Sequence, residues 1–427
     1  MTTLIIMLVL FGLLCISMPV SFSMAVSGVV GLFMFGGVDM AMSVLTRTML
    51  SAVDKYELIT IPMFLLMAEF VIVSGIADSL FRAAAAWIGR VPGGLGMATA
   101  LSGAGFGAVC GTSSASAATL SSTSLPAMIR QGYEPSMAAG VVAVSGTLAM
   151  LIPPSVAFVV FGLLAEVSIG KLLIAGILPA VVVTITIMST VAFLVWRDPS
   201  RAPLAPHVPM SERWALTKEV APMVILFAVI TGLIYSGIST PTEAAALGAL
   251  TAFLLAAWRR KINRKTTLHA LRRAAIGTSM ILIILLGASM FSYAFVLTRV
   301  TQDLVMFVGD LDVSRWVIIV IILCIYLILG CFMDQMAILV LTVPVVLPVV
   351  VSLGFDPIWY GVLLVVTAEV GLITPPVGIN CFIVARYSGR PIGEVFRGAF
   401  PHVIAHIIAL AILTAFPIIS LYLPSKM

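Results

Sequence analysis

The sequence predicts an all-α polytopic membrane protein made of two inverted-topology repeats, and three observations lead to this fold class. Of the 427 residues, 61% are hydrophobic and 10% are charged, whereas about 25% charged residues are usual in a soluble domain. Apolar runs of roughly 20 residues, long enough to cross a bilayer as a helix, recur along the chain. Prolines and glycines of the second half also repeat those of the first half at one fixed spacing.

The apolar runs divide into simple crossings and two longer, interrupted segments. The expected crossings are 4–22, 24–37, 58–75, 136–163, 172–196, 219–237, 242–258, 276–298, 358–384 and 398–423. Segments 93–129 and 316–352 are too long for one crossing and contain glycine and polar residues near their centres, so we interpret them as re-entrant helical hairpins. The first run has no cation before it and no small-residue cleavage site after it, which indicates a membrane helix rather than a signal peptide.

The positions of the cations predict the orientation in the membrane. An outside N-terminus places 17 of the 23 Lys and Arg residues on the cytoplasmic side, as the positive-inside rule requires. In a membrane protein the positions of the cations carry more information than the net charge of +5, and no nucleic-acid partner is expected. The segment 259–273, with seven cations, is either an amphipathic helix on the cytoplasmic leaflet or a solvated loop.

The internal repeat has an offset of 222 residues. The pairs at this spacing are Pro19 and Pro241, Pro126 and Pro348, Gly132 and Gly354, Pro135 and Pro357, and Pro153 and Pro375. Each half then contains five crossings and one hairpin, and the odd number of crossings inverts the second copy. Inverted repeats are typical of secondary transporters, and they predict that the two hairpin tips approach each other near the membrane midplane.

Polar residues at the two tips are the first candidates for a site. In Gly111-Thr-Ser-Ser-Ala-Ser116 the hydroxyls either cap the following helix, whose N–H groups suit a carboxylate, or join carbonyls around Na⁺; a tight helix contact is the structural alternative. The matching tip is Met333-Asp-Gln-Met336. Asp334 is either a cation ligand or a helix cap, because an unpaired carboxylate at membrane depth is costly. We expect Thr112, Ser116, Gln335 and Asn380 to contact substrate.

Two proline pairs predict broken helices after the tips. Pro153, Pro154, Pro375 and Pro376 are the expected helix-break residues, because proline removes a donor and clashes with the preceding turn. The freed carbonyls and nearby side-chain oxygens could coordinate Na⁺, and a plain kink is the alternative.

Other polar residues indicate structural roles or leave two readings open. Glu69 could serve buried pairing or ion coupling. Thr240 to Glu243 predicts a helix start with a capping box. His402 and His406 share a helix face, where packing is favoured over a metal site. The five scattered cysteines indicate neither disulfides nor zinc. The lack of a phosphate-binding loop argues against direct ATP hydrolysis, so the energy must come from an ion gradient or from another chain.

These motifs resemble the large M (DctM-type) subunit of tripartite ATP-independent periplasmic (TRAP) transporters. The similarity rests on Gly-Thr-Ser-Ser-Ala at the first tip, on residues 145–155 and 241–245, on Phe332-Met-Asp334 and on residues 369–380. It implies an elevator-type ion-transporter fold in the bacterial inner membrane and sodium-coupled uptake of an organic acid such as a C4-dicarboxylate or a sialic acid. The implied partners are a small four-helix Q subunit and a soluble periplasmic substrate-binding P protein. No cofactor is implied beyond Na⁺ as the coupling ion.

The resemblance also implies a site and a division of the chain. The implied sodium-binding residues are Ser113, Ser114, Gly146 and Thr147 in one half and Asp334, Gly371, Thr374 and Gly378 in the other. Residues 93–163 and 316–384 would form the transport domain, while 1–92, 164–315 and 385–427 would form scaffold and arm helices. The alternatives are a stand-alone sodium–carboxylate symporter and an intramembrane enzyme with Asp334 and Glu369 as paired acids.

Overall fold

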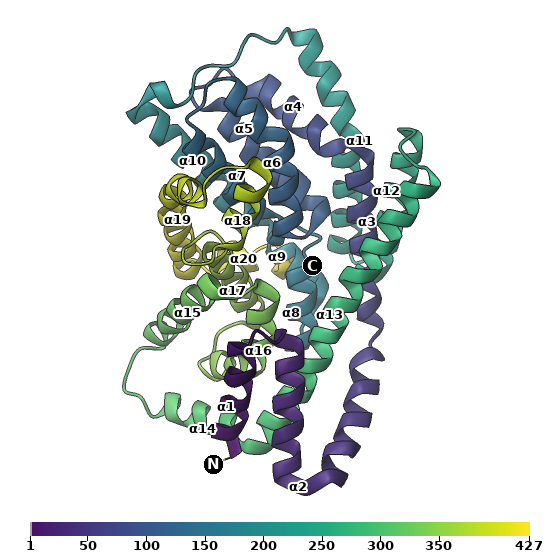
Figure 1. The fold of residues 1–427 in the computed structure, drawn as a ribbon, viewed down its shortest axis with the longest axis vertical. Coiled ribbons are helices and arrows are strands. Elements are labelled where there is room, and N and C mark those ends of the chain that lie inside the picture. The colour runs from purple at the N-terminus through teal and green to yellow at the C-terminus, as the bar shows by residue number, and fades with distance from the viewer. Residues whose placement is uncertain (1) are drawn as a thin grey trace.

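The computed structural model describes residues 2–427, apart from the side chains of residues 49, 52 and 53, and within that range it contains helices and no strands. Nine of the described helical segments are long and apolar enough to cross a membrane. Figure 1 shows an elongated bundle with α1, α2 and α14 at one end and the loop before α11 at the other. A polytopic all-helical membrane protein, as predicted from composition, is therefore confirmed.

The helix bounds follow the turn and cap residues of the sequence. In chain order the α-helices are α1 Thr2–Cys15, α2 Val20–Val53, α3 Thr60–Ser74, α4 Ile76–Ile88, α5 Gly94–Cys110, α6 Ser113–Arg130, α7 Pro135–Thr147, α8 Val156–Ala165, α9 Ile169–Ala175, α10 Ile177–Arg197, α11 Met210–Tyr235, α12 Pro241–Trp258, α13 Arg264–Thr298, α14 Val300–Gly309, α15 Arg315–Phe332, α16 Gln335–Ser352, α17 Pro357–Gly371, α18 Ile379–Ser388, α19 Ile392–Ala415 and α20 Ile418–Leu421. Short 3₁₀ turns are Tyr56–Ile59, Leu148–Met150, Pro199–Arg201 and Pro424–Lys426.

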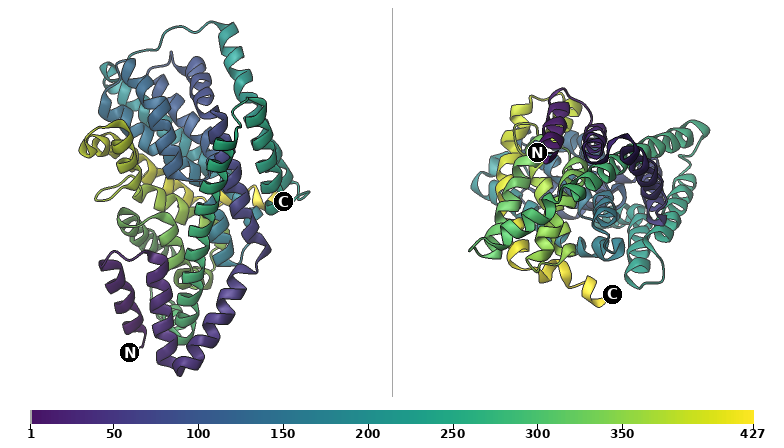
Figure 2. Two further views of the ribbon diagram at one scale, coloured as in Figure 1. Left: turned by 45° about the vertical axis from the view of Figure 1, so that its right-hand side comes forward. Right: turned by 90° about the horizontal axis from the view of Figure 1, so that it is seen from below.

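The N-terminal spans differ from their predicted bounds. The first helix ends at Cys15, because Pro19 interrupts the apolar run that we expected to continue to residue 22. Helix α2 then continues past residue 37 to Val53, with non-helical backbone at Gly36 and Gly37. The left view of Figure 2 shows the resulting V of two arms. The second arm was not predicted, since its apolar residues are mixed with hydroxyls and Arg47.

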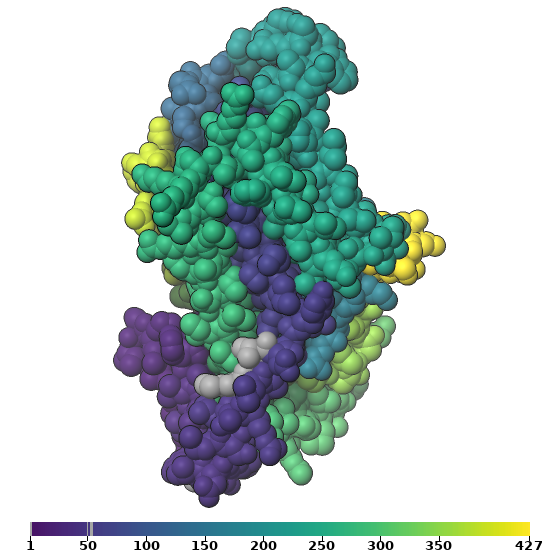
Figure 3. Space-filling view, turned by 90° about the vertical axis from the view of Figure 1, so that its right-hand side faces the viewer, coloured from purple at the N-terminus to yellow at the C-terminus, as the bar shows by residue number. Residues whose placement is uncertain are grey.

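The basic segment 259–273 is neither of the two predicted alternatives. Its first residues form a turn, and from Arg264 onward it is the beginning of α13, which continues without a break to Thr298. Asn263 caps this helix by accepting a hydrogen bond from the N–H of Thr266 at 2.8 Å. In Figure 3, α12 and α13 in green lie beside α2 and α3 in purple and blue, and these helices are in contact.

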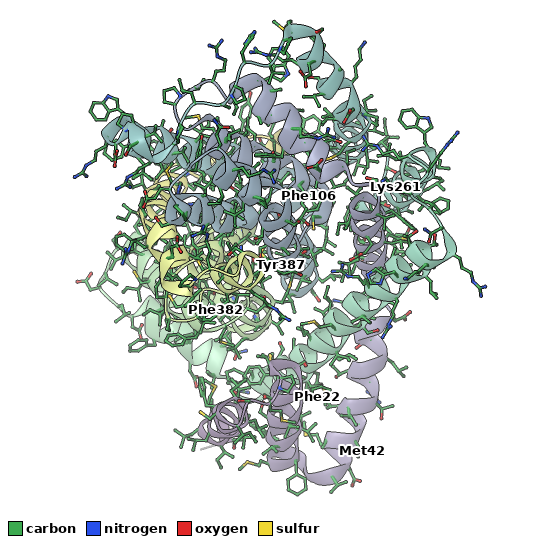
Figure 4. All side chains as sticks on the ribbon, turned by 45° about the horizontal axis from the view of Figure 1, so that its top comes forward. Phe22, Met42, Phe106, Lys261, Phe382 and Tyr387 are labelled. Carbon is green, nitrogen blue, oxygen red and sulfur yellow. The ribbon has the colours of Figure 1, made fainter. Side chains whose placement is uncertain are left out.

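The core lies around the broken helices. All residues of α7 after its first proline are buried, as are all residues of α17 from Trp359 onward. Phe106 of α5 is 1% exposed, whereas Met42, which follows the bend in α2, lies at the periphery of the molecule and is 56% exposed (Figure 4). Helix α7 therefore forms the centre of one half and α17 the centre of the other.

Candidate functional site

The first tip is a two-residue break between α5 and α6. Gly111 ends α5 with φ +66°, a conformation that glycine adopts without strain, and Thr112 is the N-cap residue of α6. A Cβ at Gly111 would lie 2.5 Å from the carbonyl oxygen of Pro154. The tip therefore rests directly on the proline pair of the same half.

The predicted hydroxyls of this tip take different positions. Ser113 and Ser116 are buried, Thr112 is half-buried and Ser114 is exposed. The Thr112 side chain makes no capping hydrogen bond, so the capping role proposed for the hydroxyls does not fall to this residue. The first N–H groups of α6 consequently keep their capacity to bind an anion or a carboxylate.

The first broken helix contains the predicted residues Gly146, Thr147, Pro153 and Pro154. α7 ends at Thr147, and α8 begins at Val156 after the bond between the two prolines, which is cis. The Thr147 hydroxyl donates to the carbonyl of Val144 at 2.9 Å, and its oxygen lone pairs stay available to a cation. A Cβ at Gly146 would lie 2.8 Å from that of Ala117, so α7 and α6 touch at this level.

The second tip places Asp334 at the start of α16. One carboxylate oxygen accepts a hydrogen bond from the N–H of Met336 at 3.0 Å, so Asp334 caps the helix. Gln335 is fully buried, and neither its oxygen nor its nitrogen has a hydrogen-bond partner among the described residues. Asp334 also borders a largely apolar cavity of about 670 Å³, whose other walls are the first turn of α2 and residues 275–284 of α13.

The second broken helix contains Gly371, Thr374, Pro375, Pro376 and Gly378. Gly371 lies against Gly330 of α15, where a Cβ on Gly330 would be 2.9 Å from the Gly371 Cα. The Thr374 hydroxyl donates to the carbonyl of Val370 at 2.6 Å, and Gly378, with φ +49°, is the N-cap residue of α18. This proline pair is also cis and is exposed, whereas Pro153 and Pro154 are buried.

The two halves interlock at the broken helices. α6 packs against α18, and α16 packs against α8. The side-chain amide of Asn380 in α18 donates to the carbonyl of Ala143 in α7 at 3.2 Å. Direct hydrogen bonds between the two tips are not found in the described part of the chain, and the approach of the tips near the membrane midplane stays a prediction.

Some of the buried polar atoms without partners lie on the same elements. Within residues 2–427 these are the hydroxyls of Ser116 and Ser145, both side-chain atoms of Gln335, both oxygens of Glu369 and the amide oxygen of Asn380, while others, such as the ring nitrogens of His402, lie elsewhere. Buried polar groups are nearly always hydrogen-bonded, so the atoms on the broken helices and hairpins are candidates for contact with ions, water or a polar solute. Hydroxyl, amide and carboxylate oxygens are the ligands that hard cations prefer.

Two of these residues were missing from the predicted site. Ser145 precedes the predicted Gly146 by one residue, and Glu369 was considered only as an alternative catalytic acid. The available signal for Glu369 was its isolation as the one carboxylate in the apolar segment 357–371.

The remaining candidates lie outside the tips and the broken helices. Glu69 forms an ion pair with Arg273 at 3.3 Å, which is the pairing alternative. The capping box is confirmed: the Thr240 hydroxyl accepts from the N–H of Glu243, and Glu243 accepts from the N–H of Thr240. His402 and His406 are buried on α19, where His406 Nδ1 is 3.0 Å from the His402 carbonyl oxygen. Clusters of three metal-ligating side chains do not occur among the described residues.

A multi-pass bundle with two interrupted hairpins, two broken helices and unpaired polar atoms at their ends defines a membrane transport protein. Residues 7–419 match the family described as "Tripartite ATP-independent periplasmic transporter, DctM component", and the chain belongs to this family. It is a permease subunit of the inner membrane rather than an enzyme.

Individual relatives are similar to this chain over most of its length. The C4-dicarboxylate TRAP transporter large permease protein DctM of Pseudomonas aeruginosa is 35% identical over 87% of both chains. The isethionate TRAP transporter permease protein DctMQ of Oleidesulfovibrio alaskensis is 28% identical over 97% of this chain and 66% of that protein. The YdaH transporter of Alcanivorax borkumensis has a similar fold, with a TM-score of 0.62 and 15% identity over 90% of this chain and 89% of that one.

Proposed function

We propose that this protein carries an organic acid, such as a C4-dicarboxylate, a sialic acid or a similar carboxylate, into the cell with the sodium gradient. The observation that carries the proposal is the set of buried, unpartnered oxygens at the ends of two broken helices and two hairpins. Buried polar atoms of this kind suit an ion or a polar solute, hydroxyl, carboxylate and carbonyl oxygens of the same elements suit Na⁺, and the free first turn of α6 suits a carboxylate. The C4-dicarboxylate named for the Pseudomonas relative supports the substrate class.

The two halves are proposed to be inverted repeats. The starts of four helices in the first half match those of four helices in the second half. The pairs are α2 at 20 with α12 at 241, α5 at 94 with α15 at 315, α6 at 113 with α16 at 335, and α7 at 135 with α17 at 357. These starts differ by 221 or 222 residues. The crosswise contacts of α6 with α18 and of α16 with α8 exchange equivalent helices between the halves, as a pseudo-twofold axis requires.

The sodium ligands are proposed in two groups that follow the repeat. Ser113, Ser114, Gly146 and Thr147 form the first, and Asp334, Gly371, Thr374 and Gly378 form the second. Thr112, Ser116, Gln335 and Asn380 would contact the organic acid. The unpartnered amide atoms of Gln335 and the free amide oxygen of Asn380 support a role in binding a polar solute.

Movement of the site is proposed to occur by an elevator mechanism. Segments 93–163 and 316–384 would move as a transport domain against helices from 1–92, 164–315 and 385–427. The cavity beside Asp334 supports this division, because one wall belongs to α16 and the others to α2 and α13. An incompletely packed boundary is compatible with sliding.

Two further subunits complete the proposed transporter. A small four-helix Q subunit would contact the exposed apolar helices, and a soluble periplasmic P protein would deliver the substrate. The tripartite family supports both partners. The relative named DctMQ, of which this chain covers 66%, supports an association with a Q portion.

Reconstitution tests the proposal. The purified chain, with its Q and P partners, is placed in proteoliposomes, and uptake of radiolabelled succinate and sialic acid is followed with and without an inward sodium gradient. We expect uptake only with the gradient and with the P protein. Equal uptake without sodium would refute the coupling, and uptake without the P protein would favour a stand-alone symporter.

A further inference from the structure

A second cavity lies between the two sets of helices that the proposed mechanism would move against each other. It has a volume of about 480 Å³, within the range of about 300–1,000 Å³ that is usual for small-molecule sites. One wall is formed by the second arm of α2 and by residues 288–296 of α13. The facing wall consists of Leu163, Leu164 and Glu166 at the end of α8 and Pro344 of α16.

The α2 and α13 wall is polar along two helical stripes. Ser43, Arg47 and Ser51 follow one another at intervals of four residues on α2, and Ser289, Ser292 and Tyr293 share one face of α13. Both helices are candidate membrane spans. Because charged and polar side chains in such helices face a protein interior or a wet cavity rather than lipid, these stripes mark a hydrated chamber.

The chamber has an excess of positive charge and free donors. Lys55 is 3.6 Å from Glu166, so those two charges offset each other. Arg47 forms no ion pair with any carboxylate of the described residues. Ser51 and Ser289 donate to backbone carbonyls, whereas Ser43, Ser292 and Tyr293 have no side-chain hydrogen bond within the part of the chain that is described. A guanidinium with several hydroxyls is a donor set for a carboxylate.

The chamber and the Asp334 cavity are lined by different residues of the same three helices, α2, α13 and α16. Residues 275–284 of α13 line the cavity at Asp334, and residues 288–296 line the chamber. On α16, Pro344 follows Asp334 by ten residues, which corresponds to about 15 Å along the helix. The positively charged chamber and the second tip therefore lie along the same contact between α13 and α16.

We propose that this chamber is an outer vestibule that receives the anionic substrate through Arg47 before the substrate reaches the hairpin tips. The proposal rests on the proposed function for the direction and identity of the substrate. The chamber contains Arg47 and Lys55, which the charge distribution places on the outer side. Electrostatic attraction in a narrow cavity raises the local concentration of the opposite charge, so Arg47 would lower the half-saturating substrate concentration.

The charge of the chamber is measured without any substrate. Ser292→Cys is introduced into a chain whose five native cysteines are replaced, and its reaction with an anionic and a cationic methanethiosulfonate reagent is followed from the outside. Arg47→Glu should lower the ratio of the anionic to the cationic rate roughly tenfold, because it reverses one charge in the wall of the cavity that contains the thiol. Arg47→Lys should keep the ratio, and Lys426→Glu, an exposed cation outside the chamber, should change it less than about twofold.

The substrate route is measured by succinate uptake in proteoliposomes with the partner subunits. Arg47→Gln should raise the half-saturating concentration about five- to tenfold while the maximal rate changes little, and Arg47→Lys should restore it. Three results would each overturn the vestibule. The thiol in the Ser292→Cys variant could fail to react, Arg47→Glu could leave the ratio of the two labelling rates unchanged, or Arg47→Gln could leave the half-saturating succinate concentration unchanged. If the wild-type protein shows no sodium-driven uptake, the proposed function fails, while the labelling ratio still reports on the chamber.

Discussion

Replacing Asp334 by Asn separates its capping role from its proposed role as an ion ligand. Asn and Asp are equally good N-cap residues, so Asp334→Asn should keep the bond to Met336 and leave thermal stability nearly unchanged. Asp334→Ala removes the cap and should cost about 1 kcal/mol of stability. In a protein of this size that cost lowers Tm by about 1–2 °C.

The expected effect on transport is much larger than the effect on stability. A carboxylate charge about 4 Å from a cation, at an effective dielectric constant of about 20, contributes up to about 4 kcal/mol. Its loss would weaken sodium binding by up to about a thousandfold. Both Asp334→Asn and Asp334→Ala should therefore lose sodium-driven uptake at ordinary sodium concentrations, although both should be inserted in the membrane.

Asp356→Asn is a matched control for this experiment. Asp356 caps α17 by accepting from the N–H groups of Ile358 and Trp359 at 2.7 and 3.3 Å, and it lies outside the proposed ion site. The same chemical change there should leave uptake and sodium dependence intact. Normal sodium-driven uptake by Asp334→Asn would show that Asp334 only caps α16.

Three further predictions concern stability, measured as thermal unfolding of the detergent-purified protein. Gly371→Ala should destabilise by about 1–3 kcal/mol, because the new Cβ would meet the Gly330 backbone; Gly393→Ala, which has open space, is the control, and equal behaviour would contradict the close approach. Thr240→Ala should cost about 1 kcal/mol through loss of the capping box, and an unchanged Tm would argue against it. Tyr133→Phe leaves the buried N–H of Leu95 without the acceptor now at 3.0 Å and should cost about 1–3 kcal/mol; a neutral effect would mean that another acceptor replaces it.

The sequence predicted the breaks in the helices better than the helix ends. Helices are interrupted at Pro153–Pro154 and at Pro375–Pro376, as expected from the missing N–H donor of proline. Helix α12 begins at the predicted capping box. The predicted end of the first span at residue 22 was wrong, because the apolar run continues past Pro19 although α1 ends at Cys15. The predicted start of the span at residue 276 was wrong, because α13 begins at Arg264. The cation-rich segment before residue 276 has no apolar pattern by which a helix could be distinguished from a loop.

The site was predictable where a residue was chemically out of place in an apolar segment. Asp334 was found in this way, but its bond to Met336 depends on backbone geometry that a sequence does not specify. The different exposure of Ser113 and Ser114 likewise depends on how α6 is rotated. The contact of Asn380 with Ala143 joins residues 237 positions apart, and such distant pairs follow from packing rather than from local pattern.

The interlocked packing of α6 with α18 and of α16 with α8 limits how the two halves can diverge. A substitution on one hairpin changes a surface whose counterpart is encoded in the other half of the chain. Exchanging one half for that of a relative would therefore leave mismatched surfaces at both contacts, that of α6 with α18 and that of α16 with α8. Chimeras that exchange residues 93–163 and 316–384 together would keep each pair of partners and should fold more readily than single-half exchanges.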